Sequence, residues 1–121
     1  KYEALEWSGE NCSKENPSEL IVGYIAQWEH LWESLSSVGT LPEIDFKKCV
    51  IAAVFLGPRP TGGYSVEFGQ PCLKDNKMVI PYREHRPGAG QFVTQVFTRP
   101  YAIKVFEKKA EAVLSREETE K

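Results

Sequence analysis

The segment CVIAAVFL, residues 49–56, decides the fold because it is apolar at every position. A strand that faces water on one side alternates apolar and polar residues, whereas a strand buried on both faces is apolar throughout. The segment therefore predicts a central strand, with a helix against one face and other packed structure against the second. Cys49, its first residue, is expected to be a buried thiol.

An amphipathic helix is predicted upstream of that strand, over about residues 24–37. Trp28 and Trp32 are four residues apart on its apolar face, so we expect them to attach the helix to a sheet rather than to stack on a ligand. Gly39 and Pro42 end the pattern. The apolar positions, spaced by three and four residues, are Ile21, Tyr24, Ile25, Trp28, Leu31, Trp32 and Leu35.

Five other segments carry the alternation, or the β-branched and aromatic residues, that are typical of strands. Arg99-Pro100 separates the last two, because proline has no amide proton and belongs at the start of a strand or at an edge. A very short strand is also expected at residues 20–22. The five segments are residues 2–8, 64–68, 78–82, 92–97 and 101–106.

The C-terminal sequence EKKAEAVLSREETEK, residues 107–121, is rich in helix formers and predicts a short helix that ends in a solvated tail. The expected fold class is α+β. It comprises an antiparallel β-sheet of about five strands, one amphipathic helix packed on that sheet and a short C-terminal helix.

The composition suits one globular domain of 121 residues, with 41% hydrophobic and 26% charged residues. A net charge of −2 without a basic face gives no reason to expect a nucleic-acid partner. The longest apolar run is too short to span a bilayer. We expect a single domain over residues 1–121, with an N-terminal strand and helix in 1–47, a core in 50–106 and a helical tail in 107–121.

The three cysteines are an odd number, which makes a poor disulfide framework. Cys12 and Cys72 lie in polar, turn-like surroundings and could form a disulfide with each other. The sequence leaves open whether they are bonded.

No catalytic pattern is present in the sequence. It lacks a nucleophile elbow, a phosphate-binding glycine loop before a helix and the spacing of a zinc site. Cys72 and His85 could be drawn as a dyad, but nothing in the sequence supplies an orienting third group or an oxyanion hole. We therefore expect no enzyme activity, no catalytic residue, no cofactor and no metal.

GPRPTGGYSVEF, residues 57–68, forms a stiff corner after the central strand. Its two prolines fix φ and its paired glycines can adopt positive φ, so the loop should lose little entropy when it binds a partner. Arg59 is expected to point outward, where its guanidinium could hold a partner's carboxylate or an aromatic ring. The alternative, that proline and glycine only shape a tight turn, stays open.

Two more segments, HRPGAGQF (residues 85–92) and TRPY (residues 98–101), repeat the Arg-Pro dipeptide. If residues 92–97 form a straight strand, these two corners lie roughly 25 Å apart at opposite ends of the sheet and cannot share one site. The residues predicted to bind a partner are Arg59, Pro60, Thr61, Gly62, Gly63, Tyr64, Arg86, Gly88, Arg99 and Tyr101.

AAVFLGPRPTGGYSVEF, followed by VIPYREHRPGAGQFVTQVFTRPYAIKVF, resembles the PrcB C-terminal domain family over residues 50–106. These are bacterial domains named for a subunit of a surface protease complex, and no catalytic residues are ascribed to them. The resemblance implies an exported protein-binding module at the cell surface, in the periplasm or on a lipid anchor. It would be an accessory or stabilising subunit of a protease or envelope complex, although no signal sequence is visible from Lys1 onward.

RPTGGY (residues 59–64), GAG (88–90) and RPY (99–101) also resemble, in the same order, the three loops of chagasin-type inhibitors of cysteine proteases. Two features depart from that pattern: only about one strand separates the last two segments, and Tyr101 replaces a tryptophan. A protease inhibitor acting through the 59–64 loop is therefore an alternative function. A structural envelope protein and an enzyme with an undetected site are the others.

Overall fold

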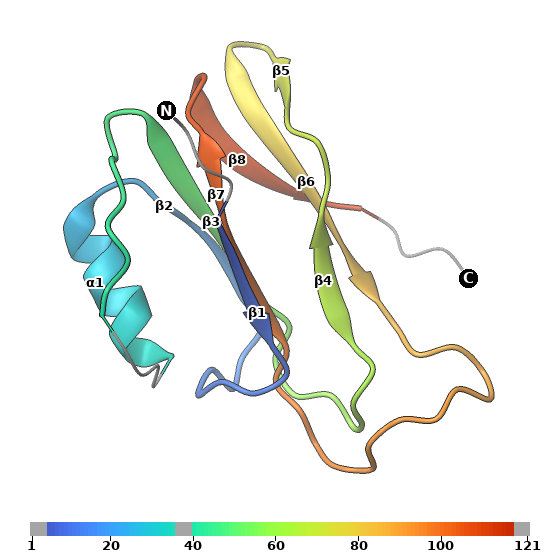
Figure 1. Cartoon of the computed structure of the whole chain (residues 1–121). Helices are drawn as coiled ribbons and strands as arrows, with labels where there is room; N and C mark the ends of the chain where they lie inside the picture. Colours follow the sequence, from blue (N-terminus) through green and yellow to red (C-terminus); the bar gives the residue numbers. More distant parts are fainter. Residues whose placement is uncertain (1–4, 36–39, 118–121) are drawn as a thin grey trace.

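The computed structural model describes residues 5–35 and 40–117, which form one helix and eight strands (Figure 1). The α+β class and the mainly antiparallel pairing are confirmed, but the strands form two sheets instead of one. In chain order the elements are β1 (Glu6–Gly9), β2 (Ser18–Val22), α1 (Ile25–Ser34), β3 (Cys49–Phe55), β4 (Ser65–Phe68), β5 (Cys72–Lys74), β6 (Lys77–His85), β7 (Tyr101–Glu107) and β8 (Glu111–Arg116).

The first sheet has the strand order β1-β7-β3-β2 and is antiparallel throughout. β3 lies in its interior, paired with β7 from Cys49↔Glu107 to Phe55↔Tyr101. All seven residues of β3 are buried, as its unbroken apolar sequence predicted. β1 and β2, which precede the core expected at residues 50–106, are the two edge strands of this sheet.

α1 covers the outer face of the first sheet. Trp28 is completely buried there with Ile51 and Phe55 of β3, and its Nε1 donates a hydrogen bond to the carbonyl oxygen of Pro42 at 2.8 Å. Trp7 and Trp32 complete an aromatic cluster with Trp28, with ring centroids 5.4–5.7 Å apart. The predicted role of the two helix tryptophans is confirmed. The helix is shorter than predicted, and residues 36 and 37 of the predicted range lie outside the described residues.

The second sheet packs on the inner face of the first. β6 pairs with β4 and β5 on one side and with β8 on the other, and the β6–β8 pairing is parallel. Alternate residues of β6 face inward and meet the inner face of β3, which presents Val54 and, just after the strand, Leu56. The central strand is thus covered by a helix on one face and a second sheet on the other.

The predicted C-terminal helix is wrong, because residues 111–116 form strand β8. Ala112 and Leu114, two residues apart, pack against the core between the sheets, and Lys77 pairs with Glu111 at 2.9 Å. Helix propensity is a weak preference that tertiary packing overrides. The core between the sheets and the available side of β6 together select a strand here.

The strand predicted at residues 92–97 is also wrong, since these residues belong to no strand. β5, by contrast, was not predicted. It forms a tight hairpin with β6 in which Asp75 and Asn76 have φ of 53° and 67°, a backbone conformation that asparagine and aspartate tolerate better than most residues.

The three cysteines are free. Cys49 is buried, as predicted, and this burial raises the pKa of its thiol. Cys12 packs against the core beneath α1, whereas Cys72 is exposed on β5 of the other sheet, so the considered disulfide is not formed. Within the described residues, no helix is long and apolar enough to cross a membrane.

Candidate binding surface at the loop end

Two segments meet at one end of the two sheets: residues 57–64, here called the corner, and residues 86–100, called the return segment (Figure 1). The amide of Arg59 donates to the carbonyl of Thr98 at 2.8 Å, and the amide of Thr98 donates back at 2.9 Å. The amide of Gly62 donates to the carbonyl of Thr94 at 2.9 Å. The condition under which the Arg86 and Arg99 corners would lie at opposite ends is therefore not met, because residues 92–97 form no strand and the return segment bonds to the corner.

Glycine is required at two positions of the corner. Gly57 and Gly63 have φ of 79° and 94°, in the left-handed region that side chains disfavour. A Cβ on Gly57 would lie 2.9 Å from Pro17, and one on Gly63 would lie 2.8 Å from Val93 and 2.9 Å from Pro87. The corner thus packs closely against both the N-terminal loop and the return segment.

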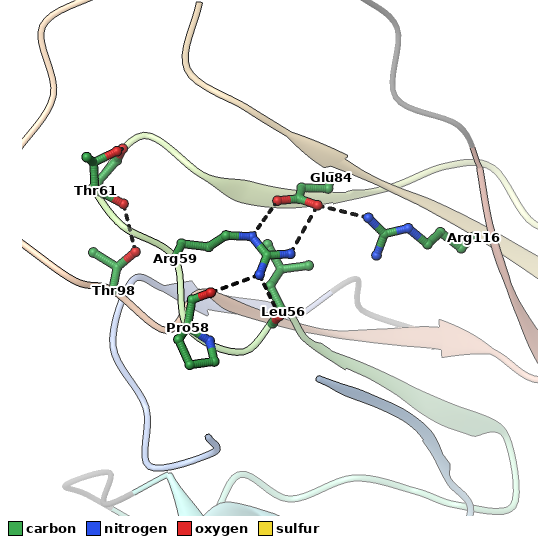
Figure 2. Close-up of polar contacts among 8 residues, drawn as sticks. Leu56, Pro58, Arg59, Thr61, Glu84, Thr98 and Arg116 are labelled. Atoms are coloured by element: carbon green, nitrogen blue, oxygen red, sulfur yellow. Dashed lines mark hydrogen bonds and ion pairs between the residues drawn. The ribbon is translucent and has the colours of Figure 1, made fainter. Parts of the chain in front are cut away.

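Arg59 points inward, contrary to the prediction (Figure 2). Its Nε and Nη2 donate to the two carboxylate oxygens of Glu84 at 2.7 and 3.2 Å, and its Nη1 donates to the carbonyls of Leu56 and Pro58 at 3.0 Å. The guanidinium can hold a carboxylate by two bonds, as anticipated, but that carboxylate belongs to this chain. The corner is stabilised from within by its own arginine.

Glu84 is only 1% exposed, and Arg116 of β8 donates to it at 2.8 Å from the opposite side (Figure 2). Burial by itself raises the pKa of Glu84. The hydrogen bonds and charges of Arg59 and Arg116 outweigh this effect, so the pKa lies below its ordinary value of 4.5. The sequence held a signal for this network, because the inward alternation of Met78, Ile80 and Tyr82 continues to Glu84. A buried carboxylate requires a cation.

A second polar link joins the sheets beside this network. The hydroxyl of Tyr82 donates to the carboxylate of Glu19 on β2. Burial, followed by the hydrogen bond and charge of Glu19, raises the pKa of Tyr82 to about 12. The corner therefore begins where the two sheets are joined by charged and hydrogen-bonded groups.

The other predicted binding residues are distributed around this end. Thr61 donates its hydroxyl to the carbonyl of Gly62 at 2.8 Å and accepts a bond from Thr98 on its own carbonyl at 2.9 Å. The ring of Tyr64 lies 5.8 Å from the guanidinium of Arg59. Pro60, Arg86 and Gly88 are exposed. Arg99 lies near Glu15, with Nη2 and Oε2 3.7 Å apart. Tyr101 stacks on Phe55, with ring centroids 6.3 Å apart.

Three exposed apolar residues were not predicted as part of a site. Phe92 is fully exposed, Phe97 is 80% exposed and Val96 is 54% exposed. We call them the apolar tip of the return segment. The sequence carries a signal against the strand predicted here: Arg-Pro dipeptides and two glycines bound a stretch of eight residues, 91–98.

Cys72 and His85, considered as a dyad from the sequence, lie on different strands of the second sheet. His85 Nε2 lies 2.5 Å from Glu67 Oε1, and both side chains are exposed. Cys72 pairs with Val79, six residues along β6 from His85, which separates them by roughly 20 Å. The Cys72–His85 dyad is therefore not formed. Among the described residues, no cluster of His, Cys, Asp and Glu could hold a metal ion.

Residues 50–107 match the family model described as PrcB C-terminal, which confirms the resemblance noted in the sequence. No curated protein and no solved structure matches the chain. The matched segment runs from β3 to the end of β7 and includes the corner and the return segment. β1, β2, α1 and β8 lie outside it, although they complete both sheets and the helical layer.

Proposed function

We propose that this chain, whose residues 50–107 match the PrcB C-terminal family, is a non-enzymatic protein-binding module. Its role is that of an exported accessory or stabilising subunit in a protease or envelope complex. The observation that carries the proposal is the apolar tip, where two phenylalanines and a valine are exposed on one short segment. Exposed aromatic residues are enriched at protein-binding surfaces, where they supply much of the binding energy.

Hydrogen bonds to the corner hold in place the return segment, which carries the apolar tip. The return segment is bonded to the corner at Thr94 and Thr98, and the corner is bonded in turn to the sheet through Arg59. A segment that is held before binding loses less conformational entropy when a partner arrives. Arg86 is also exposed on the same segment, and polar residues usually surround the apolar centre of an interface.

A cross-linking experiment tests this function in the native envelope. Phe92 and Phe97 are replaced, one at a time, by the photoreactive residue p-benzoyl-phenylalanine, which retains an aromatic side chain. Tyr24, which is 59% exposed at the start of α1, receives the same replacement as the control. Both tip positions should capture the same protein, identified by mass spectrometry as a protease or a component of its complex, and position 24 should not.

Two results would count against the proposal. If the tip positions capture nothing, or the same proteins as position 24, the loop end is not the binding surface. If they capture a protein unrelated to proteolysis, the binding surface stands and the protease association fails. With the partner identified, the double variant Phe92→Ala/Phe97→Ala should weaken binding by about 2 kcal/mol or more, as the loss of buried aromatic contacts does at other interfaces.

Protease inhibition is a second candidate because three segments that resemble inhibitor loops meet at one end. The backbone bonds between Arg59 and Thr98 and between Gly62 and Thr94 join the first segment to the chain that links the other two. The test is a panel of papain-like and serine proteases assayed with excess domain. Inhibition that the Phe92→Ala/Phe97→Ala variant abolishes would support this function, and undiminished hydrolysis across the panel would remove it.

A further inference from the structure

A groove lies at the other end of the second sheet, where β4 stops and β5 begins. Residues 69–71 interrupt the edge of the sheet, and a hollow of about 540 Å³ opens beside them. Its floor is formed by Phe68, Met78 and Phe106, and its rim includes Cys72, Lys104 and Lys109. This volume lies within the range of roughly 300–1,000 Å³ that is usual for ligand sites.

Lys104 occupies an unusual position in this groove. It lies on the inner face of β7, between Ala102 and Phe106, both of which are buried in the core between the sheets. Its Nζ is 5.4 Å from the ring centroid of Phe106, and it forms no ion pair with any carboxylate that the structure describes. Lys109, on the rim, approaches Glu107 at 3.7 Å. The groove therefore combines an apolar floor with two lysines and the carboxylate of Glu107, and Lys104 is the lysine that forms no ion pair within the described residues.

The groove also offers free main-chain groups. The amide of Gly69 donates to the carbonyl of Pro81 at 2.8 Å, but Gln70 forms no main-chain hydrogen bond within the described residues. An acyl chain cannot form hydrogen bonds with main-chain groups, whereas an extended peptide can.

We propose that this groove binds the carboxy terminus of a polypeptide whose last residue is apolar. The terminal side chain lies on Phe68, Met78 and Phe106, the terminal carboxylate pairs with Lys104, and the preceding peptide group bonds to Gln70. The site is separate from the apolar tip, so it stands or falls independently of the function proposed above.

The test uses a fluorescein-labelled hexapeptide, Gly-Ser-Gly-Ser-Val-Leu, with a free carboxy terminus. Its binding to the whole chain is followed by fluorescence anisotropy and compared with the same peptide carrying a terminal amide. We expect saturable binding that amidation weakens at least about tenfold, because a hydrogen bond to a charged group is lost. Cys72 supplies an internal footprint: it is exposed on the groove rim, and bound peptide should slow its alkylation by iodoacetamide.

Lys104→Met keeps most of the length of the side chain and removes its charge. It should abolish the difference between the acid and the amide, while Lys108→Met, an exposed lysine outside the groove, should preserve it. Equal binding of acid and amide to the wild type, or no protection of Cys72, would overturn the proposal. If dodecanoate protects Cys72 and the peptide does not, the groove is an acyl-chain site and the peptide assignment is wrong.

Discussion

The corner and the return segment have similar sequences and opposite environments. Each contains Arg-Pro and glycine, and they lie side by side at one end of the molecule. The corner directs its arginine inward, where Arg59 is 23% exposed and bonded to Glu84. The return segment exposes Phe92 and Phe97 to solvent. The same local chemistry thus forms a support in one segment and leaves large apolar side chains exposed in the other.

The difference arises from residues distant in the sequence. Glu84 lies 25 positions after Arg59 and occupies an inward position of β6, where an unpaired carboxylate would be very costly. Arg86 lies beyond the end of β6 and is exposed. Arg59 is therefore structural because a buried carboxylate lies within its reach, whereas the side chain of Arg86 is exposed.

The largest expected effect is the loss of stability on removing Arg59. Arg59→Ala leaves Glu84 buried with only part of its hydrogen bonding and should lower the free energy of unfolding by about 3 kcal/mol. Arg86→Ala should change it by less than about 0.5 kcal/mol, as expected for an exposed site. Urea unfolding of both variants measures the contrast. Equal losses would show that the two arginines are equivalent, as an outward-facing Arg59 would require.

Acid should lower the stability that the Arg59–Glu84 contact gives to the fold. The pKa of Glu84 is lower in the folded protein than its ordinary value of 4.5, so its contribution to stability is complete above about pH 4.5 and is lost as the pH falls through the folded pKa. Glu84→Gln should remove this part of the acid dependence. Urea unfolding between pH 2 and pH 7 measures it, with Glu43→Gln as the exposed control. A wild-type profile identical to that of Glu84→Gln would contradict the assignment.

Glycine substitutions should distinguish the two segments next. Gly63 and Gly90 have similar positive φ, 94° and 81°, so alanine is strained at both. A Cβ at Gly63 would contact Val93 and Pro87 below 3.0 Å, whereas a Cβ at Gly90 meets nothing within 4 Å. Gly63→Ala should therefore be more destabilising than Gly90→Ala by roughly 1–3 kcal/mol, the usual cost of overpacking. Thermal unfolding of the two variants tests this. Equal midpoints would mean that the neighbours of Gly63 move aside for the added Cβ at little energetic cost.

The smallest effect on stability is expected at the apolar tip. Phe92→Ala and Phe97→Ala remove side chains that are already exposed, so each should alter the free energy of unfolding by less than about 0.5 kcal/mol. The same changes should weaken partner binding, which separates a display surface from a structural one. A loss of 2 kcal/mol or more in urea unfolding would mean that these rings are packed in solution and would remove the basis of the proposed surface.

The apolar pattern of the sequence was sufficient to predict the central strand and the helix that packs on it. CVIAAVFL required burial on both faces, and the tryptophans at positions 28 and 32 required a surface to pack against; the structure supplies both. The pattern could not separate one sheet from two, because an inward-facing strand alternates in the same way whichever sheet contains it. The predictions of a helix at residues 111–116 and of a strand at 92–97 failed for a related reason. Helix and strand propensities describe isolated segments, whereas strand pairing depends on whether a neighbouring strand is available.

The sequence by itself determined the buried strand, the amphipathic helix, the tight corner and the resemblance of residues 50–106 to one family. Those features follow from local chemistry: the period of apolar residues, the fixed φ of proline and the freedom of glycine. Only the tertiary structure decided that Arg59 is a support, that the return segment lies against the corner and that Lys104 faces a groove. Each depends on which distant residue lies within hydrogen-bonding or packing distance, and that is set by how the strands pair and how the sheets stack.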